Sequence, residues 1–82
     1  MYFVYALYSE SFDKIYVGYS SDVQKRLLAH NDKRNTGWTS KFQPWKILYT
    51  EMCNTKAEAL KREKQLKSSR GRNFIRKLIK SD

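Results

Sequence analysis

Near its start the chain carries seven consecutive apolar and aromatic residues, from Tyr2 to Tyr8 (YFVYALY). Aromatic and β-branched side chains favour an extended backbone. In a run without a polar residue, both faces of the strand are apolar, so neither is suited to contact water. The run is far shorter than the ~20 residues with which a helix crosses a membrane. We therefore expect a β-strand that is buried on both faces, or nearly so, and no membrane span.

The rest of the chain predicts two further strands and three helices. Turn-forming residues over 9–14 separate the first strand from the second, so these two strands are expected to form a hairpin. In chain order, the predicted elements are strands at 2–8 and 15–19, a helix at 22–30, a strand at 45–51, and helices at 56–67 and 72–80. The economical architecture is an α+β fold, with a small three-stranded antiparallel sheet flanked by helices in the order β-β-α-β-α-α. At 82 residues we expect a single domain over 1–82.

Two of the predicted helices start with the pattern of a capping box, in which serine or threonine is followed three residues later by glutamate or glutamine. These pairs are Ser21 with Gln24 and Thr55 with Glu58. Between the first predicted helix and the third strand lies a polar connection over 31–43. A connection of this length is unusual in a compact domain, so we expect a functional loop there.

The chain is strongly basic, with 17 Lys and Arg against 8 Asp and Glu and a net charge of +9. Most of the excess, net +7, lies in residues 56–82, where basic residues alternate with aliphatic ones at helical spacing. Such a folded basic face favours a polyanion such as DNA as the partner, and a solvated face that only aids solubility is the alternative. Trp38 lies among the loop residues and is expected to be exposed. The residues expected to contact nucleic acid are Lys33, Arg34, Lys41, Lys67, Arg70 and Arg72.

Cysteine and histidine each occur once, as Cys53 and His30. One cysteine makes no disulfide within the chain, and with one histidine it makes no zinc cluster. We therefore interpret Cys53 as an inert core or surface thiol. The lack of disulfides and of a basic leader favours a protein of the reducing cytoplasm.

Three polar residues, Asp22, Arg26 and His30, are spaced four apart and so share one face of the first predicted helix. An arginine and a histidine one turn apart can bind a phosphate, the guanidinium through two oxygens and the imidazole as a donor or proton carrier. The plainer alternative is an Asp–Arg helical pair beside a surface histidine, and the spacing alone favours it.

Glu63 falls inside the apolar stripe that Ala59, Leu60 and Leu66 form on the second predicted helix, whereas Glu58 falls on the far side. A carboxylate on the core side of a helix is unfavourable unless something pairs with it. The partner is either a basic side chain or a divalent metal such as Mg²⁺, which needs only one or two protein carboxylates.

The first two strands carry two short motifs, Phe3-Val4-Tyr5 and, eleven residues on, Tyr16-Val17-Gly18. Together with Arg26, His30 and Glu63, they resemble the GIY-YIG nuclease superfamily, with Phe-Val-Tyr in place of Gly-Ile-Tyr and Tyr-Val-Gly in place of Tyr-Ile-Gly. The resemblance spans nearly the whole chain. It is to the small stand-alone bacterial members, which are similar to the N-terminal nuclease module of the excinuclease C subunit.

The resemblance implies an endonuclease that hydrolyses DNA phosphodiester bonds with Mg²⁺ or Mn²⁺ and serves DNA repair or recombination. It also implies that Tyr5 and Tyr16 line the site and that one of them helps to activate the attacking water. Arg26 would hold the scissile phosphate, His30 would assist, and Glu63 would bind the metal. These residue types suit phosphoryl transfer, which needs charge neutralisation and a positioned nucleophile more than covalent chemistry.

Two positions bear on how far the resemblance reaches. Phe3 stands where the first motif has glycine, a strand position that affects only local packing. Asn73 is the candidate for an asparagine that larger members carry after the glutamate. A DNA-binding module without turnover is the alternative function, because the basic face alone would support it. A protein-interaction domain is disfavoured by the charge of +9.

Overall fold

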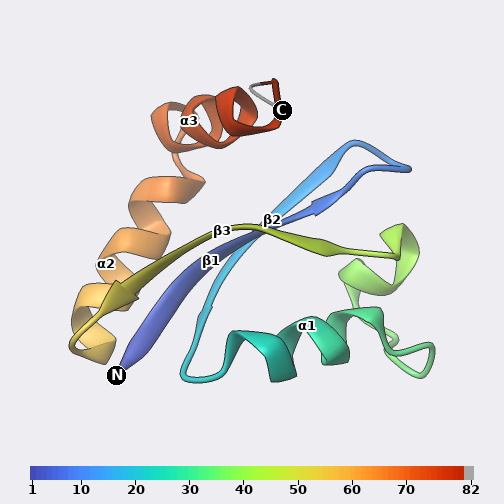
Figure 1. The fold of residues 1–82 in the computed structure, drawn as a ribbon, viewed down its shortest axis with the longest axis horizontal. Coiled ribbons are helices and arrows are strands. Elements are labelled where there is room, and N and C mark those ends of the chain that lie inside the picture. Colours follow the sequence, from blue (N-terminus) through green and yellow to red (C-terminus); the bar gives the residue numbers. More distant parts are fainter. Residues whose placement is uncertain (81–82) are drawn as a thin grey trace.

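The computed structural model describes residues 1–80, within which three strands form one antiparallel sheet with helices on both sides (Figure 1). The elements, in chain order, are β1 (Tyr2–Ser9), β2 (Lys14–Ser20), α1 (Val23–Asn31), the short 3₁₀ helix η1 (Trp38–Phe42), β3 (Lys46–Cys53), α2 (Lys56–Lys67) and α3 (Ser69–Lys80). This confirms the predicted α+β fold and its order, with η1 as an addition inside the connection that was predicted to be a loop. No helix in this part of the chain is long and apolar enough to span a membrane.

β1 is the central strand, because the sheet order is β2-β1-β3 and β1 pairs antiparallel with both neighbours. In the pairing with β2, Tyr5 lies opposite Gly18 and Leu7 lies opposite Tyr16. The four consecutive residues 4–7 are each 1% exposed or less. This confirms the prediction that both faces of the strand are covered, and it explains why the run contains no polar residue.

Side chains that alternate along the strands form two cores, one on each face of the sheet. The core on the α2 and α3 side consists of Val4, Ala6, Val17, Cys53, Ala59, Leu66 and Ile75. On the other side Tyr5, Leu7 and Trp45 form the core, and partly buried side chains of β2, α1 and η1, Tyr16 among them, pack against it. The two tyrosines of the sequence motifs thus face α1 and η1.

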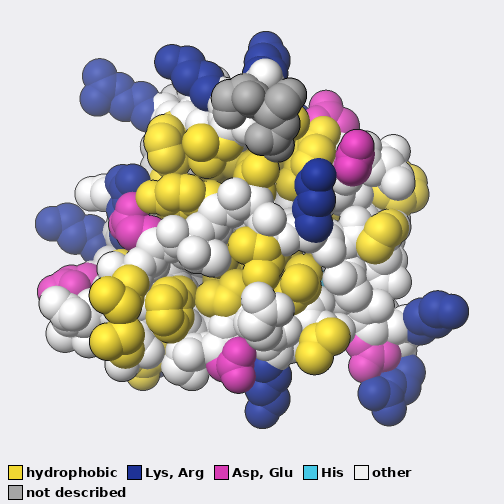
Figure 2. All heavy atoms as spheres, in the orientation of Figure 1, with side chains coloured by type: hydrophobic (Ala, Val, Ile, Leu, Met, Phe, Trp, Pro, Cys, Tyr) yellow, Lys and Arg dark blue, Asp and Glu magenta, His cyan; other side chains and the backbone are white. Residues whose placement is uncertain are grey.

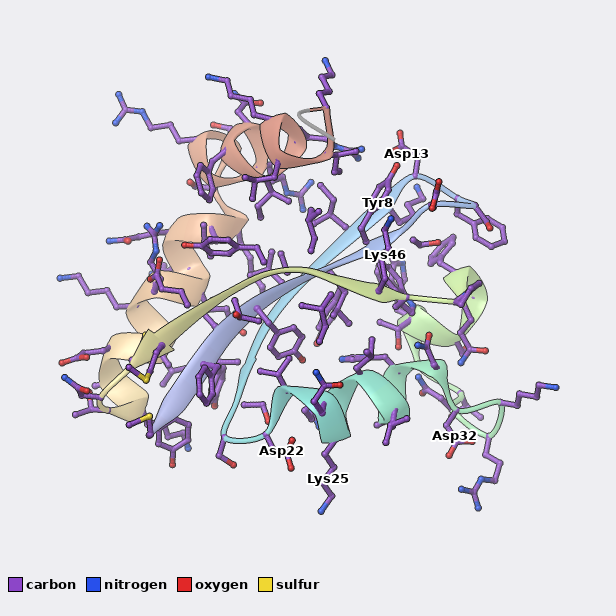
Figure 3. The ribbon with its side chains drawn as sticks, viewed as in Figure 1. Tyr8, Asp13, Asp22, Lys25, Asp32 and Lys46 are labelled. Atoms are coloured by element: carbon purple, nitrogen blue, oxygen red, sulfur yellow. The ribbon has the colours of Figure 1, made fainter. Side chains whose placement is uncertain are left out.

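The predicted capping box at the start of α1 is wrong. The N-cap is Asp22, whose carboxylate accepts a 3.1 Å hydrogen bond from the backbone N–H of Lys25 in the first turn (Figure 3). The Ser20 hydroxyl in turn accepts a 3.0 Å bond from the N–H of Asp22, while Ser21 is exposed. Three successive residues that all favour the N-cap position made the pattern ambiguous, and the helix uses the last of them.

The cap predicted for α2 is confirmed. The hydroxyl of Thr55 accepts a 3.1 Å bond from the N–H of Glu58. The Glu58 carboxylate reaches back to the N–H of Asn54, also at 3.1 Å. The side chain of Glu58 is therefore committed to the helix start and lies away from the sheet.

α3 begins at Ser69, earlier than the predicted residue 72, because Gly71 does not interrupt the helix. Gly71 is buried inside the first turn of the helix. A Cβ at this position would collide with the backbone of Gln65 and Leu66 in α2. Glycine is needed because the two helices approach each other so closely at their junction.

Polar side chains tie the connection over 31–43 to its neighbours. Asn31 donates to the carbonyl of Trp45 at 2.9 Å and accepts from the N–H of the same residue at 2.6 Å. Gln43 donates to two backbone carbonyls at the end of α1, at 2.9 and 2.8 Å. These bonds close the connection over the end of α1 and hold η1 beside the sheet.

Candidate active site

Tyr5 and Tyr16 lie next to each other on the face of the sheet that α1 and η1 cover. They come from neighbouring strands, and their ring centroids are 6.3 Å apart. Gly18 lies opposite Tyr5, and a Cβ at Gly18 would stand 2.7 Å from the Tyr5 hydroxyl oxygen. The glycine of the second motif therefore leaves the space into which the phenol of the first motif extends.

His30 of α1 contacts both tyrosines. It is buried, with only 8% of its surface exposed. Its Nε2 lies 3.2 Å from the Tyr5 hydroxyl, and its ring centroid is 4.6 Å from that of Tyr16. Its other nitrogen, Nδ1, lies 3.1 Å from Oγ1 of Thr39 in η1. That oxygen accepts a 2.9 Å bond from Nδ2 of Asn35. A chain of polar contacts thus runs from Asn35 through Thr39 and His30 to Tyr5.

The buried surroundings keep both His30 and Tyr5 uncharged. Burial, and to a lesser extent the charge of Arg26, lowers the pKa of His30, so the imidazole is neutral near neutral pH. Burial raises the pKa of Tyr5, against an opposing hydrogen bond from Arg26. With a neutral ring, either the phenol donates to Nε2 while Nδ1–H donates to Thr39, or both bonds run in the opposite direction.

Arg26 lies one turn before His30 and is exposed to solvent. Its guanidinium acts on Tyr5 through a hydrogen bond and through its charge, which places it beside the tyrosine pair. Within residues 1–80 no ion pair joins it to Asp22 or to another acid. The Asp–Arg pair that the helical spacing favoured is therefore not formed, and the guanidinium is available to bind an anion.

Glu63 of α2 points toward the sheet, as the position in the apolar stripe predicts. Its side chain is 18% exposed, and its charge is one of the causes that raise the pKa of Tyr5. Leu60, which the stripe also included, is instead 42% exposed. Glu63 does have a basic partner, because Nζ of Lys67 lies 3.7 Å from its carboxylate, but the Lys67 side chain is 53% exposed. The pair is therefore not a buried ion pair.

The donor chemistry around Glu63 fits a hydrated Mg²⁺ ion and does not fit a cation that is held by protein ligands alone. Within residues 1–80 no three His, Cys, Asp or Glu side chains lie close enough to hold a metal ion. Mg²⁺ usually keeps several waters and binds through one or two carboxylates together with substrate phosphates. A single, partly buried carboxylate whose charge acts on Tyr5 meets that requirement.

A cleft of about 450 Å³ adjoins Tyr16 and follows the open edge of β2. Its basic lining comes from one strand and two helices: Lys14, Lys67, Arg72 and Arg76. The structure thus places Lys67 and Arg72, of the six residues predicted to contact nucleic acid, in one cleft beside Tyr16. Lys14 and Arg76 were not among the residues predicted to contact nucleic acid, because neither stands out from the many other basic residues in the sequence.

The remaining predicted contact residues lie outside this cleft, although Lys and Arg side chains project widely over α2, α3 and the end of α1 (Figure 2). Lys33 and Lys41 are exposed. Arg34 forms an ion pair with Asp32 at 2.8 Å, and the hydrogen bond from Arg34 lowers the pKa of Asp32 to about 2. Arg70 lines a separate hollow between α2 and α3. Asn73 is exposed on α3 and does not line the cleft either.

The neutral state of His30 predicts a specific dependence of stability on pH. A histidine whose pKa is lower in the folded than in the unfolded protein contributes stability that is present above its ordinary pKa of 6.5 and lost as pH falls through the folded value. We expect the melting temperature to fall between about pH 7 and about pH 5 in the native protein, and to change less in His30→Gln. The lowered pKa values of Asp13 and Asp32 affect only more acidic conditions. Equal slopes in the two proteins would contradict the prediction.

Comparison with known proteins places this arrangement in a family. The GIY-YIG catalytic domain family matches residues 1–77. A UPF0213 protein of Staphylococcus saprophyticus is 41% identical over 54 residues, which are 66% of this chain and 66% of the relative. UPF0213 proteins of Staphylococcus epidermidis and Staphylococcus aureus are 39% and 41% identical over the same share of each chain, so the matched part spans just under two thirds of these relatives. No solved structure matches the chain significantly. The chain therefore belongs to the GIY-YIG catalytic domain family.

Proposed function

We propose that this protein is an endonuclease that hydrolyses DNA phosphodiester bonds with Mg²⁺ or Mn²⁺ as cofactor. The observation that carries the proposal is that Tyr5, Tyr16 and His30 pack together beside a basic cleft, and that the charges of Arg26 and Glu63 both act on Tyr5. By its likeness to the nuclease module of excinuclease C, we assign the cleavage to DNA repair or recombination in the cytoplasm.

In this proposal Arg26 binds the scissile phosphate. The planar guanidinium can hold two phosphate oxygens and can offset the negative charge that builds up in the transition state. The side chain is exposed and has no acidic partner within residues 1–80, so it can take a phosphate without breaking an existing pair. Positioning and charge stabilisation of this kind account for most of the catalysis of phosphoryl transfer.

Tyr16 is the better placed of the two tyrosines to contact the attacking water. Tyr5 is 1% exposed and its pKa is raised by burial, so it resists the ionisation that a base requires. Tyr16 is half-buried and lines the cleft, with the neutral ring of His30 4.6 Å away. Tyr5 and His30, which are buried and pack against Tyr16, would then assist by holding the Tyr16 ring in position.

Glu63 would hold the metal, and waters and a substrate phosphate would complete its shell. When bound, Mg²⁺ supplies positive charge that offsets the charge of the phosphate and lowers the pKa of a coordinated water. Residues 1–80 would then contribute one metal ligand from Glu63, the Arg26 contact to the phosphate and the Tyr16 contact to the water, while His30 and Tyr5 assist by orienting Tyr16.

A nicking assay on supercoiled plasmid tests the proposal. We expect the purified protein to convert the plasmid to open circles with Mg²⁺ and to leave it intact with EDTA. In EDTA it should still bind duplex DNA, with an affinity that falls steeply with salt at a log–log slope of about −0.9 per phosphate neutralised. Salt-dependent binding without nicking would favour the alternative function, a DNA-binding module without turnover. An affinity indifferent to salt would contradict both.

A further inference from the structure

Trp38, the first residue of η1, keeps 49% of its surface exposed, although burying so large an aromatic side chain would be favourable. Its ring is not loose, because it packs 4.8 Å from the ring of Phe42 and 5.9 Å from that of Trp45. Trp45 is itself buried, and its indole N–H donates a 2.8 Å bond to the carbonyl of Thr39. One side of the Trp38 ring is therefore held by packed aromatic rings, while the rest is open to a ligand.

A second exposed ring extends this surface. Phe12, at the turn between β1 and β2, is 50% exposed and meets Phe42 edge-on at 5.6 Å. Nζ of Lys14 lies 5.4 Å from the centre of the Phe42 ring. We name the three rings of Phe12, Trp38 and Phe42 the aromatic shelf. Two large rings left half in water gain apolar burial when a ligand with flat apolar faces covers them.

The aromatic shelf continues into the basic cleft, because Trp38 lines that cleft together with Tyr16. Four cations line it, and the one acid among its lining residues, Asp13 at the hairpin tip (Figure 3), is ion-paired with Arg76. A neutral apolar partner would strip water from these cations without replacing it. A ligand that carries both negative charges and flat aromatic faces can bind the cations of the cleft and stack on the rings of the aromatic shelf at the same time.

We propose that the basic cleft and the aromatic shelf bind an unpaired nucleotide of DNA next to the phosphate that is cut, with its base stacked on Trp38. The inference rests on the proposed function, since it names the substrate class of the same site: single-stranded, flapped or frayed DNA rather than fully paired duplex. In a duplex the faces of the bases are closed by their neighbours unless a base leaves the stack. In a single strand every base offers an open face to an aromatic ring, while its phosphates meet the cations of the cleft.

Binding measured in EDTA tests the inference without cleavage. A labelled single strand of about 12 nucleotides and a blunt duplex of the same sequence are titrated with protein, and tryptophan fluorescence is followed. We expect the single strand to bind more tightly and to quench the fluorescence. Trp38→Leu keeps apolar bulk but has no aromatic face, so it should weaken single-strand binding about 5- to 100-fold and duplex binding less than about twofold. Trp38→Phe should retain most of the affinity.

The Leu and Phe variants control for folding, because both keep a large apolar side chain beside Phe42 and Trp45. Phe74→Ala is the matched control for loss of an exposed aromatic residue, since Phe74 is 40% exposed on α3 and lines the separate hollow; it should bind both DNAs as the native protein does. Equal losses on single strand and duplex in Trp38→Leu, or none, would overturn the inference. Displacement of the single strand by polyglutamate at comparable charge would also overturn it and would point to an acidic protein.

The same experiments separate this inference from the proposed function. A protein that nicks plasmid but binds both DNA forms alike, whatever stands at residue 38, keeps the proposed function and loses the inference. A protein that binds single strands through Trp38 but, with Mg²⁺ or Mn²⁺, cuts neither plasmid nor single-stranded or flapped DNA supports the inference about the occupant of the cleft and contradicts the proposed function.

Discussion

Arg26→Ala is expected to slow DNA cleavage about 10²- to 10³-fold while DNA binding stays within a few fold of the native protein. The reason is that a contact to the charge of the transition state acts on the rate, whereas binding is spread over the cations of the cleft. The fold should be unaffected, because Arg26 is exposed and forms no ion pair within residues 1–80. Single-turnover nicking, gel shifts and a melting scan measure the three quantities.

Two further variants make the test of Arg26 specific. Lysine carries the same charge but cannot hold two oxygens of one phosphate in a planar fork, so Arg26→Lys is expected to cleave poorly as well. Lys25→Ala removes the same charge from the neighbouring position, whose side chain points away from the sheet (Figure 3), and it should cleave at nearly the native rate. Full activity in Arg26→Lys, or equal losses in Lys25→Ala and Arg26→Ala, would contradict the assigned role.

Local patterns were enough to predict the elements of this fold. The apolar run of β1 is informative because a central strand has no exposed side, and residues 4–7 are indeed buried. The bounds of α2 match the prediction at both ends, because Thr55 is a strong cap and Ser68 ends the helix. Where several residues could serve equally, as in the serines beside Asp22, the pattern could not choose between them. Gly71 misled for a related reason, since a glycine that permits close packing looks in sequence like one that ends a helix.

The parts of the candidate site that sequence could not supply depend on packing between elements. Thr39 reaches His30, and Asn35 reaches Thr39, only because the connection folds into η1 over the end of α1. No periodicity relates a residue of that connection to the preceding helix. Arg76 lines the cleft through its ion pair with Asp13, a contact between α3 and the hairpin turn. By contrast, the orientation of Glu63 followed from the positions of its own helical neighbours, which is local information.

Glu63→Gln is expected to reduce Mg²⁺-dependent cleavage by at least about 100-fold and to leave the fold in place. Glutamine keeps the shape of the side chain and removes the charge that a metal needs. The ammonium of Lys67, whose side chain is 53% exposed, can return to water, so losing the pair should destabilise the protein by less than about 1 kcal/mol. A buried cation left without its partner would cost several times more, about 3–5 kcal/mol. DNA binding should hold or tighten, because a negative charge close to phosphate has gone.

Three comparisons separate a metal ligand at residue 63 from a carboxylate that serves only its lysine. Titration of Mn²⁺ by electron paramagnetic resonance, with an uncleavable DNA analogue bound, should lose a site in Glu63→Gln and keep it in Glu58→Gln, the same chemical change on the far side of the same helix. Lys67→Met breaks the ion pair from its other end, so it should weaken DNA binding but keep the native dependence of cleavage on Mg²⁺ concentration. If Glu63 served only the pair, Glu63→Gln and Lys67→Met would slow cleavage alike, and the Mn²⁺ site would survive in both. Unchanged nicking in Glu63→Gln would end the assignment outright, because a charge required to hold the metal cannot be replaced by an amide without loss.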